Sequence, residues 1–158
     1  MDEANSNAAD AIEAELSPAD VPSREGCGRE PTPQMLRAFE QFNRGEYWDQ
    51  HETLEEVWRA EADSSIRNLY KGIIQVGVGF HHLGRNNFPG TMKVLARGIN
   101  YLKPYAPECY GVDVARLIRE SSSVYHRARD LGPGRLGEIG LDTLPKIHLV
   151  TRPGGEAE

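Results

Sequence analysis

A histidine and a glutamate four residues apart are the residues of this chain best suited to chemistry. His51 and Glu55 lie in segment 47–59, and Trp58 follows three residues later. A helix has about 3.6 residues per turn, so these three side chains share one face, which is otherwise apolar. Burying a polar group costs free energy unless it finds a partner, so the pattern indicates a site. The residues expected on the opposite side of this helix are Asp49, Thr53, Glu56 and Ala60.

The first interpretation of this pair is a metal site. A histidine and a carboxylate four residues apart on a helix can bind one ion together. The motif reads HExxE rather than HExxH, so the metalloprotease signature is absent and no protease is predicted. His81 or His82 could supply a second histidine, which gives a ligand set suited to zinc, manganese or iron. An ion in such a set would activate a water, with Glu52 or Glu55 as the candidate general base.

Two other interpretations of the same pair need no metal. In the first, Glu55 accepts a hydrogen bond from the ring of His51 and the pair is a structural network that holds two helices in register. In the second, the pair carries out acid–base catalysis without an ion. The remaining residues predicted to line or cover the pocket are Trp48, Trp58, Tyr70 and Gln75.

Five amphipathic segments are expected to position this site. Thr32 and Pro33 are typical of a helix start, and Gly132 is typical of a helix end. The segment 66–83 is apolar around much of its circumference, so it should lie at the centre of a bundle. The sequence therefore predicts an all-α fold, a single compact bundle of about five helices. The predicted helices cover residues 33–43, 46–62, 66–83, 90–103 and 114–131.

The distribution of charge predicts the domain organisation. Residues 1–30 hold eight acidic residues, two arginines and no aromatic residue, so a disordered acidic arm is expected there. The helical domain is expected over 31–132 and an extended tail over 133–158. Leu141, Leu144 and Ile147 are candidate anchors of that tail. The two cysteines, Cys27 and Cys109, imply no disulfide framework.

Composition also excludes several classes of partner. Outside the arm the acidic and basic residues balance, so no basic footprint for nucleic acid is present. The longest apolar segment, 72–80, is too short to span a bilayer, so no membrane partner is predicted. We expect a cytoplasmic protein, and a homodimer is compatible with a small bundle rich in aromatic residues.

The residues around the motif resemble those of a known family. Segment 42–48, followed by His51, Glu55 and Trp58, is similar to the prokaryotic family called domain of unknown function 309, whose hallmark is HxxxExx(W/Y). The similarity continues through 71–75 and through His82 and Asn87, and covers roughly residues 35–120. The resemblance implies an all-α fold of about five helices and hallmark residues suspected of binding metal. It implies no established activity.

Two functional hypotheses follow. The first is a small helical protein whose His/Glu pocket binds a metal and performs metal-assisted hydrolysis. The alternative is a non-enzymatic binding or assembly module in which the pair is a structural network. The alternative rests on Phe39, Phe42, Gly45 and Tyr47, which resemble the first hairpin of a tetratricopeptide-type module.

Overall fold

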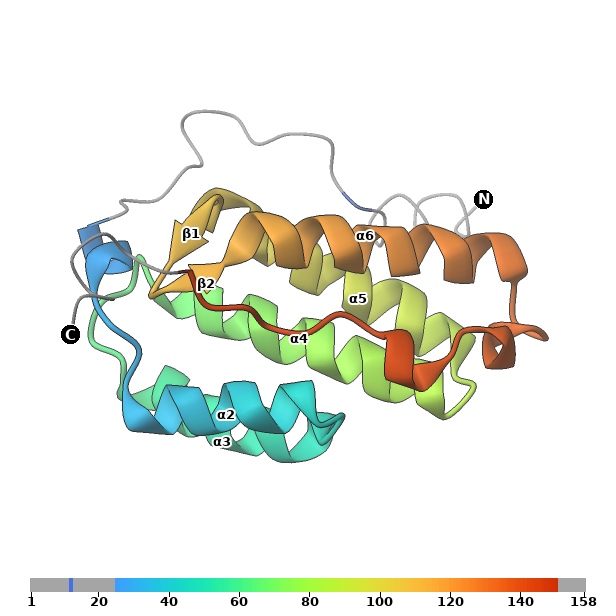
Figure 1. Cartoon of the computed structure of the whole chain (residues 1–158), viewed down its shortest axis with the longest axis horizontal. Coiled ribbons are helices and arrows are strands. Elements are labelled where there is room, and N and C mark those ends of the chain that lie inside the picture. Colours follow the sequence, from blue (N-terminus) through green and yellow to red (C-terminus); the bar gives the residue numbers. More distant parts are fainter. Residues whose placement is uncertain (1–11, 13–24, 151–158) are drawn as a thin grey trace.

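The computed structural model describes Ile12 and residues 25–150 of the chain (Figure 1). Most of the predicted acidic arm, 1–30, and residues 151–158 of the predicted tail lie outside these described residues. The prediction of an all-α fold is confirmed by the described part, which contains five α-helices and one short hairpin. The helices are α2 (Pro33–Asn43), α3 (Tyr47–Ala60), α4 (Arg67–Gly84), α5 (Phe88–Leu102) and α6 (Val114–Leu131).

Local signals in the sequence explain where these helices begin. The Thr32 side chain caps α2 by accepting a hydrogen bond from the Met35 amide, and Pro33 occupies the first turn. The helix α5 begins at Phe88, two residues before its predicted start, because Pro89 is accepted within the first turn. There the Asn87 side chain accepts a hydrogen bond from the Gly90 amide.

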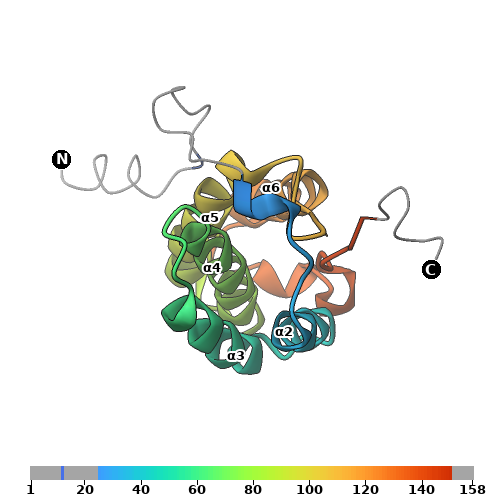
Figure 2. The same cartoon turned by 90° about the vertical axis from the view of Figure 1, so that its left-hand side faces the viewer.

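The five helices follow one another around an arc. Each helix packs against the next in the sequence, and the most extensive contact joins α4 to α5. Viewed from the end of the bundle, the arc leaves an opening between α2 and α6, and the C-terminal segment lies in it (Figure 2). As predicted from its composition, α4 is buried on several sides. Its buried residues are Leu69, Tyr70, Gly72, Ile73, Ile74, Val76, Gly77, Gly79, Phe80 and Leu83.

The C-terminal segment 133–150 forms hydrogen bonds at both ends of the arc, with α2 and with the chain just before α6. The Asn43 side chain donates a hydrogen bond to the Ile147 carbonyl (3.1 Å) and accepts one from the Ile147 amide (2.7 Å). Further along, Leu149 forms a bridge with Val112. Of the three expected anchors, Leu144 and Ile147 are buried. The third, Leu141, is 56% exposed because it lies in a surface 3₁₀ turn, η5 (Leu141–Thr143).

The described N-terminal segment is tied to a small hairpin. Strands β1 (Glu108–Cys109) and β2 (Val112–Asp113) pair antiparallel, and no pattern in the sequence predicted them. Cys27, in the 3₁₀ helix η2 (Glu25–Gly28), forms a disulfide with Cys109. The expectation of no disulfide framework is corrected here. The fold brings together two cysteines 82 positions apart, and their spacing in the sequence carries no information about that distance.

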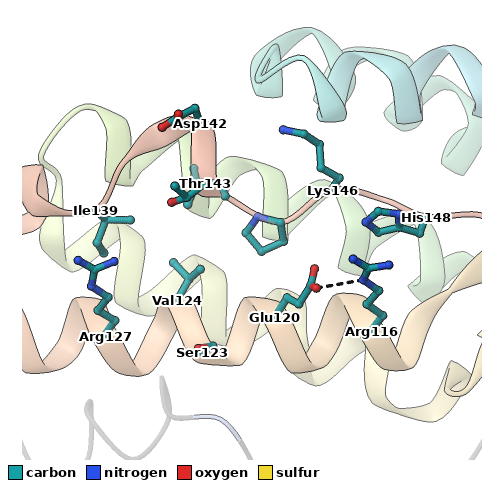
Figure 3. Close-up of a pocket in the computed structure, with 12 residues that line it drawn as sticks. Arg116, Glu120, Ser123, Val124, Arg127, Ile139, Asp142, Thr143, Lys146 and His148 are labelled. Carbon is teal, nitrogen blue, oxygen red and sulfur yellow. Dashed lines mark hydrogen bonds and ion pairs between the residues drawn. The ribbon is translucent and has the colours of Figure 1, made fainter.

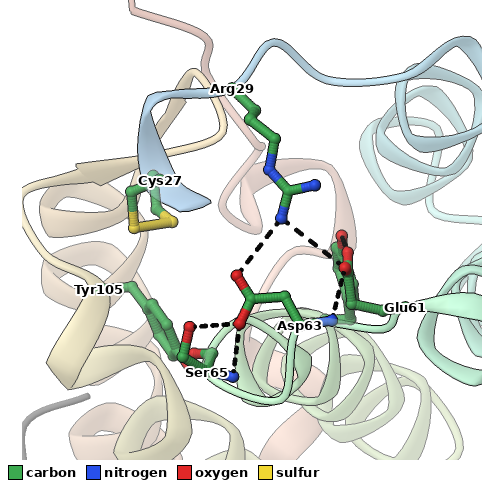
Figure 4. A network of polar contacts seen from close by, with 8 residues as sticks. Cys27, Arg29, Glu61, Asp63, Ser65 and Tyr105 are labelled. Atoms are coloured by element: carbon green, nitrogen blue, oxygen red, sulfur yellow. Dashed lines mark hydrogen bonds and ion pairs between the residues drawn. A yellow bond between two sulfur atoms is a disulfide. The ribbon is translucent and has the colours of Figure 1, made fainter. Parts of the chain in front are cut away.

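A network of polar contacts lies beside this disulfide (Figure 4). The Arg29 guanidinium lies 3.7 Å from the Glu61 carboxylate and 3.6 Å from the Asp63 carboxylate. Burial favours the neutral form of Glu61, but hydrogen bonds from Tyr70 and the Asp63 amide, with the charge of Arg29, lower its pKa overall. The Tyr105 hydroxyl donates a hydrogen bond to the Ser65 carbonyl (2.6 Å). The network therefore fixes the α3–α4 connection against the N-terminal segment.

Close contact between α4 and α5 requires a glycine in α5. A Cβ atom at Gly98 would lie 2.6 Å from the Val76 backbone nitrogen and 3.0 Å from the Gln75 carbonyl carbon. Both atoms belong to the backbone of α4 and cannot move aside as the end of a side chain can. The two helix axes therefore lie as close as they do because position 98 has no side chain.

We expect Gly98→Ala to lower the free energy of unfolding by about 1–3 kcal/mol through overpacking. This loss should appear although alanine is the better helix former by about 1 kcal/mol. Urea denaturation followed by circular dichroism measures it. The matched control is Gly137→Ala, where an added Cβ meets no atom within 4 Å. A Gly98→Ala variant as stable as the wild type would contradict the close packing.

Candidate functional site

A cavity of about 410 Å³ opens between α3, α4 and α5, on the side of α3 that carries the His51–Glu55 motif. Its walls combine aliphatic and aromatic side chains with a small number of polar groups, as is typical of ligand pockets. The lining residues are Trp48, His51, Glu55, Trp58, Lys71, Ile74, Gln75, Val78, Val94 and Arg97.

The His51–Glu55 pair meets in this pocket. The His51 Nε2 atom lies 3.2 Å from a carboxylate oxygen of Glu55, and the other oxygen of Glu55 lies 2.8 Å from the Arg59 guanidinium. The Trp48 ring covers the imidazole, with the two ring centroids 4.8 Å apart. The second ring nitrogen of His51, Nδ1, is buried and has no hydrogen-bond partner in the described part of the chain. Glu55 thus orients the imidazole while one of its nitrogens is left unsatisfied.

The motif lies at the edge of the buried face of α3 rather than at its centre. The side chains of His51 and Glu55 are 25% and 36% exposed. The buried residues of this helix are Gln50, Thr53 and Leu54, although Thr53 was expected on the opposite side. The difference arises because α3 packs against two helices. Thr53 faces α2, where its hydroxyl donates a hydrogen bond to the Gln41 side chain (2.8 Å).

Gln50 is a buried polar residue that the sequence analysis did not single out. Its side-chain amide donates a hydrogen bond to the Ile74 carbonyl of α4 (3.3 Å). A Cβ atom at position 77 would lie only 2.6 Å from the nitrogen of this amide. The absence of a side chain at Gly77 therefore leaves room for Gln50. This contact sets the distance between α3 and α4 beside the pocket.

The two candidate histidine ligands of α4 lie outside the pocket. His81 contacts Trp48, with the two ring centroids 5.5 Å apart, and lines a separate cavity together with Tyr47 and Phe80. The Nδ1 atom of His82 lies 3.1 Å from the Asn87 side-chain amide. Burial, with the nearby charges of His81 and Arg85, lowers the pKa of His82.

The predicted three-ligand set is therefore not assembled. Within residues 25–150 and at Ile12, no group of three or more His, Cys, Asp or Glu side chains is placed to hold a metal ion. The physical reason is the position of the histidines along α4. The pocket is bordered by the middle of that helix, from Lys71 to Val78, whereas His81 lies nearer its C-terminal end.

Glu52 and Tyr70, two further predicted site residues, also lie elsewhere. Glu52 is exposed and is not among the residues that line the pocket. The Tyr70 hydroxyl donates a hydrogen bond to Glu61 (2.5 Å), the carboxylate that also lies near Arg29. Burial, together with this hydrogen bond, raises the pKa of Tyr70 far above its usual value, so the hydroxyl keeps its proton. The structure thus assigns Tyr70 to the α3–α4 connection.

Gln75 does line the pocket, together with two cationic residues that the sequence analysis did not predict. The Gln75 Oε1 atom is buried and has no hydrogen-bond partner in the described residues. Lys71, one helical turn before Gln75, and Arg97 of α5 border the same cavity. The spacing of Lys71 and Gln75 was a usable signal, because residues four apart share a helix face. No sequence pattern links Arg97 to them.

A second cleft, of about 530 Å³, lies between α6 and the C-terminal segment (Figure 3). It contains none of the residues predicted from the motif. At one end the Arg116 guanidinium pairs with Glu120 at 3.0 Å, and at the other Arg127 donates a hydrogen bond to the Glu138 carbonyl. The lining of this cleft includes none of the buried, unsatisfied polar atoms found in the described residues. The α3–α4–α5 pocket is accordingly the candidate site.

The fold and the pocket define a helical protein with a His–Glu pair beside two tryptophans. Residues 35–94 match the model of the family described as Domain of unknown function (DUF309), and the resemblance predicted from the sequence is confirmed. The matched region contains every residue that lines the pocket except Arg97. No described helix is long and apolar enough to cross a lipid bilayer.

The chain is also similar to a protein of Bacillus subtilis (strain 168) named Uncharacterized protein YpuF. The two are 32% identical over 84 residues, which cover 52% of this chain and 48% of that protein. The chain thus spans about half the length of this curated relative. No solved structure matches the chain. Neither the family description nor the name of the relative assigns an activity.

Both tryptophans of the chain line the pocket, so their fluorescence reports on it directly. Trp48 is 49% exposed, whereas Trp58 is half-buried beneath the Arg67 guanidinium, 4.4 Å from its ring. Trp48 is the remaining fluorophore in Trp58→Phe, and Trp58 is the remaining one in Trp48→Phe. Because Trp48 is the more exposed ring, we expect Trp58→Phe to emit at the longer wavelength and to be quenched more strongly by acrylamide. Circular dichroism checks that both variants keep their helices. Equal quenching of the two variants would contradict the arrangement of the rings.

Proposed function

We propose that the α3–α4–α5 pocket binds a small organic molecule with a planar apolar body, and that ligand binding is the function of this domain. The observation that carries the proposal is the cavity itself, which is lined by both tryptophans and by two residues that each have a buried polar atom without a hydrogen-bond partner among the described residues. These atoms are Nδ1 of His51 and Oε1 of Gln75.

The size and the walls of the pocket support this proposal. Its volume of about 410 Å³ lies within the range of small-molecule sites, about 300–1,000 Å³. Ile74 and Val78 from α4 and Val94 from α5 supply aliphatic surface, and Trp58 supplies an aromatic ring. A planar apolar molecule would bury this surface on binding, and apolar burial is the main favourable term in such association.

The unsatisfied polar atoms favour a ligand with hydrogen-bonding groups. A buried polar atom without a partner costs about 1–3 kcal/mol. A ligand or a bound water that meets Nδ1 of His51 or the amide of Gln75 removes that cost. Since Glu55 holds the imidazole from its other nitrogen, the pair would present a fixed proton donor or acceptor to whatever binds.

The proposal is tested with N-phenyl-1-naphthylamine, a neutral probe with two linked aromatic ring systems. We expect binding to quench tryptophan emission and to sensitise emission from the probe by energy transfer. Val78→Phe, which fills the cavity, should weaken binding at least tenfold. The matched control is Val124→Phe, which places the same ring in the cleft between α6 and the C-terminal segment and should bind as the wild type does.

Two results would overturn this proposal. One is the absence of any binding by the wild-type protein. The other is binding that Val78→Phe leaves unchanged, because the probe would then occupy a different surface.

Metal-assisted hydrolysis is the second candidate, because two of the predicted ligands, His51 and Glu55, do meet at 3.2 Å. The metals that suit this pair are zinc, manganese and iron. An ion bound there would supply Lewis-acid activation of a water. Its other coordination positions would be left to water or substrate, since no third ligand from the described residues reaches the pair.

Metal content measured by plasma mass spectrometry separates the two candidates. The protein is purified without chelator, beside His51→Ala. The metal candidate requires near-stoichiometric metal in the wild type and its loss in the variant. The ligand-binding proposal expects the same metal content in both proteins. It expects His51→Ala only to lower the free energy of unfolding, by about 1–3 kcal/mol for a broken hydrogen-bonded pair.

A further inference from the structure

Building on the proposed function, we propose that the ligand is an organic anion. Its carboxylate, sulfonate or phosphate group would be held by Lys71 and Arg97, and its planar body would lie beside Trp58. The inference concerns the class of ligand and rests on the ligand-binding function of the same pocket.

The charges around the pocket carry this inference. Two lining residues, Lys71 and Arg97, are cationic, and one, Glu55, is a carboxylate. Glu55 is already engaged by Arg59 at 2.8 Å and by His51 at 3.2 Å. Lys71 has no carboxylate within ion-pair distance among the described residues, so its charge is not compensated there. Such a local excess attracts anions selectively.

Lys71 lines the pocket without an ion-pair partner among the described residues. Its ammonium lies 5.3 Å from the centre of the Tyr101 ring and 6.0 Å from that of Trp58. Among the described residues, no carboxylate lies within ion-pair distance of it. The side chain is half-buried, and a charge that is partly withdrawn from water gains from a partner of opposite sign. An anionic ligand in the pocket would supply that partner.

The geometry of the two helices directs both cations at one ligand. Lys71 and Gln75 lie one turn apart on the same face of α4. Arg97 faces them from α5, immediately before Gly98, whose missing side chain lets the two helices approach. A ligand held there would meet an ammonium, a guanidinium and an amide from two walls. Guanidinium groups bind carboxylate and phosphate in a two-pronged geometry, which would add selectivity.

Arg67, which does not itself line the pocket, holds the aromatic wall in place. Its guanidinium stacks on Trp58 at 4.4 Å, and its Nε atom is buried without a hydrogen-bond partner in the described chain. A cation over a tryptophan ring is attracted to it, so this contact holds the ring in place. The planar part of a ligand would therefore meet an ordered surface.

The experiment compares two probes that differ by a single anionic group. These are 8-anilino-1-naphthalenesulfonate and its neutral counterpart, N-phenyl-1-naphthylamine, which lacks the sulfonate. We expect the wild-type protein to bind the sulfonate at least tenfold more tightly. Lys71→Gln should remove most of that preference, measured as the ratio of the two affinities within the variant, because glutamine removes the charge of this side chain. Lys93→Gln, an exposed lysine on α5, is the matched control and should keep the full preference.

Each outcome separates this inference from the proposed function. If neither probe binds, the proposed function fails and the inference fails with it. If both probes bind equally tightly, the ligand-binding function stands and the anionic class is overturned. A preference that survives in both Lys71→Gln and Arg97→Gln also overturns it, because the sulfonate would then be recognised elsewhere.

Discussion

The close approach of α4 to both of its neighbours is the constraint on which the rest of the structure depends. On one side Gly98 brings α5 against the backbone of α4 at Gln75 and Val76. On the other side Gly77 gives room to the buried amide of Gln50, which bonds to the carbonyl of Ile74. Because these contacts lie in the middle of α4, the helices on either side are held at fixed distances there. Larger side chains at these positions would separate the helices and change every wall of the pocket.

The pocket is a consequence of that arrangement. The helices α3 and α5 both pack closely against α4. The pocket lies beside these contacts, and side chains from all three helices line it. Trp48 and Trp58, about three turns apart on α3, lie along that space. Trp48 contacts both His51 and His81, with ring centroids 4.8 Å and 5.5 Å away, but His81 lines a different cavity. Packing therefore decides which polar residues of the motif meet.

Sequence patterns could predict the elements of this fold better than the contacts between them. Thr32 and its following proline predicted the start of α2, and the His51–Glu55 spacing predicted a pair that does meet. Both signals are local, and local geometry follows from helical periodicity. The burial of Thr53 could not be read in the same way, because it depends on α2 packing against a second face of α3. The position of His81 depends likewise on how far α4 is shifted along α3. Such shifts arise from packing between helices and leave no mark on the spacing within either one.

The sign of the charge around the pocket connects the two candidate functions. A divalent ion held by His51 and Glu55 would add positive charge to a cavity that already contains Lys71 and Arg97. Like charges in a partly buried site repel one another, so the ion would need a negatively charged partner besides Glu55. Since the described residues supply only these two ligands, we expect that partner to come from the bound molecule. Without an ion, an anion would still be favoured by Lys71, which has no carboxylate within ion-pair distance among the described residues. Either chemistry at the His–Glu pair therefore leads to the same requirement, a ligand or substrate that carries negative charge.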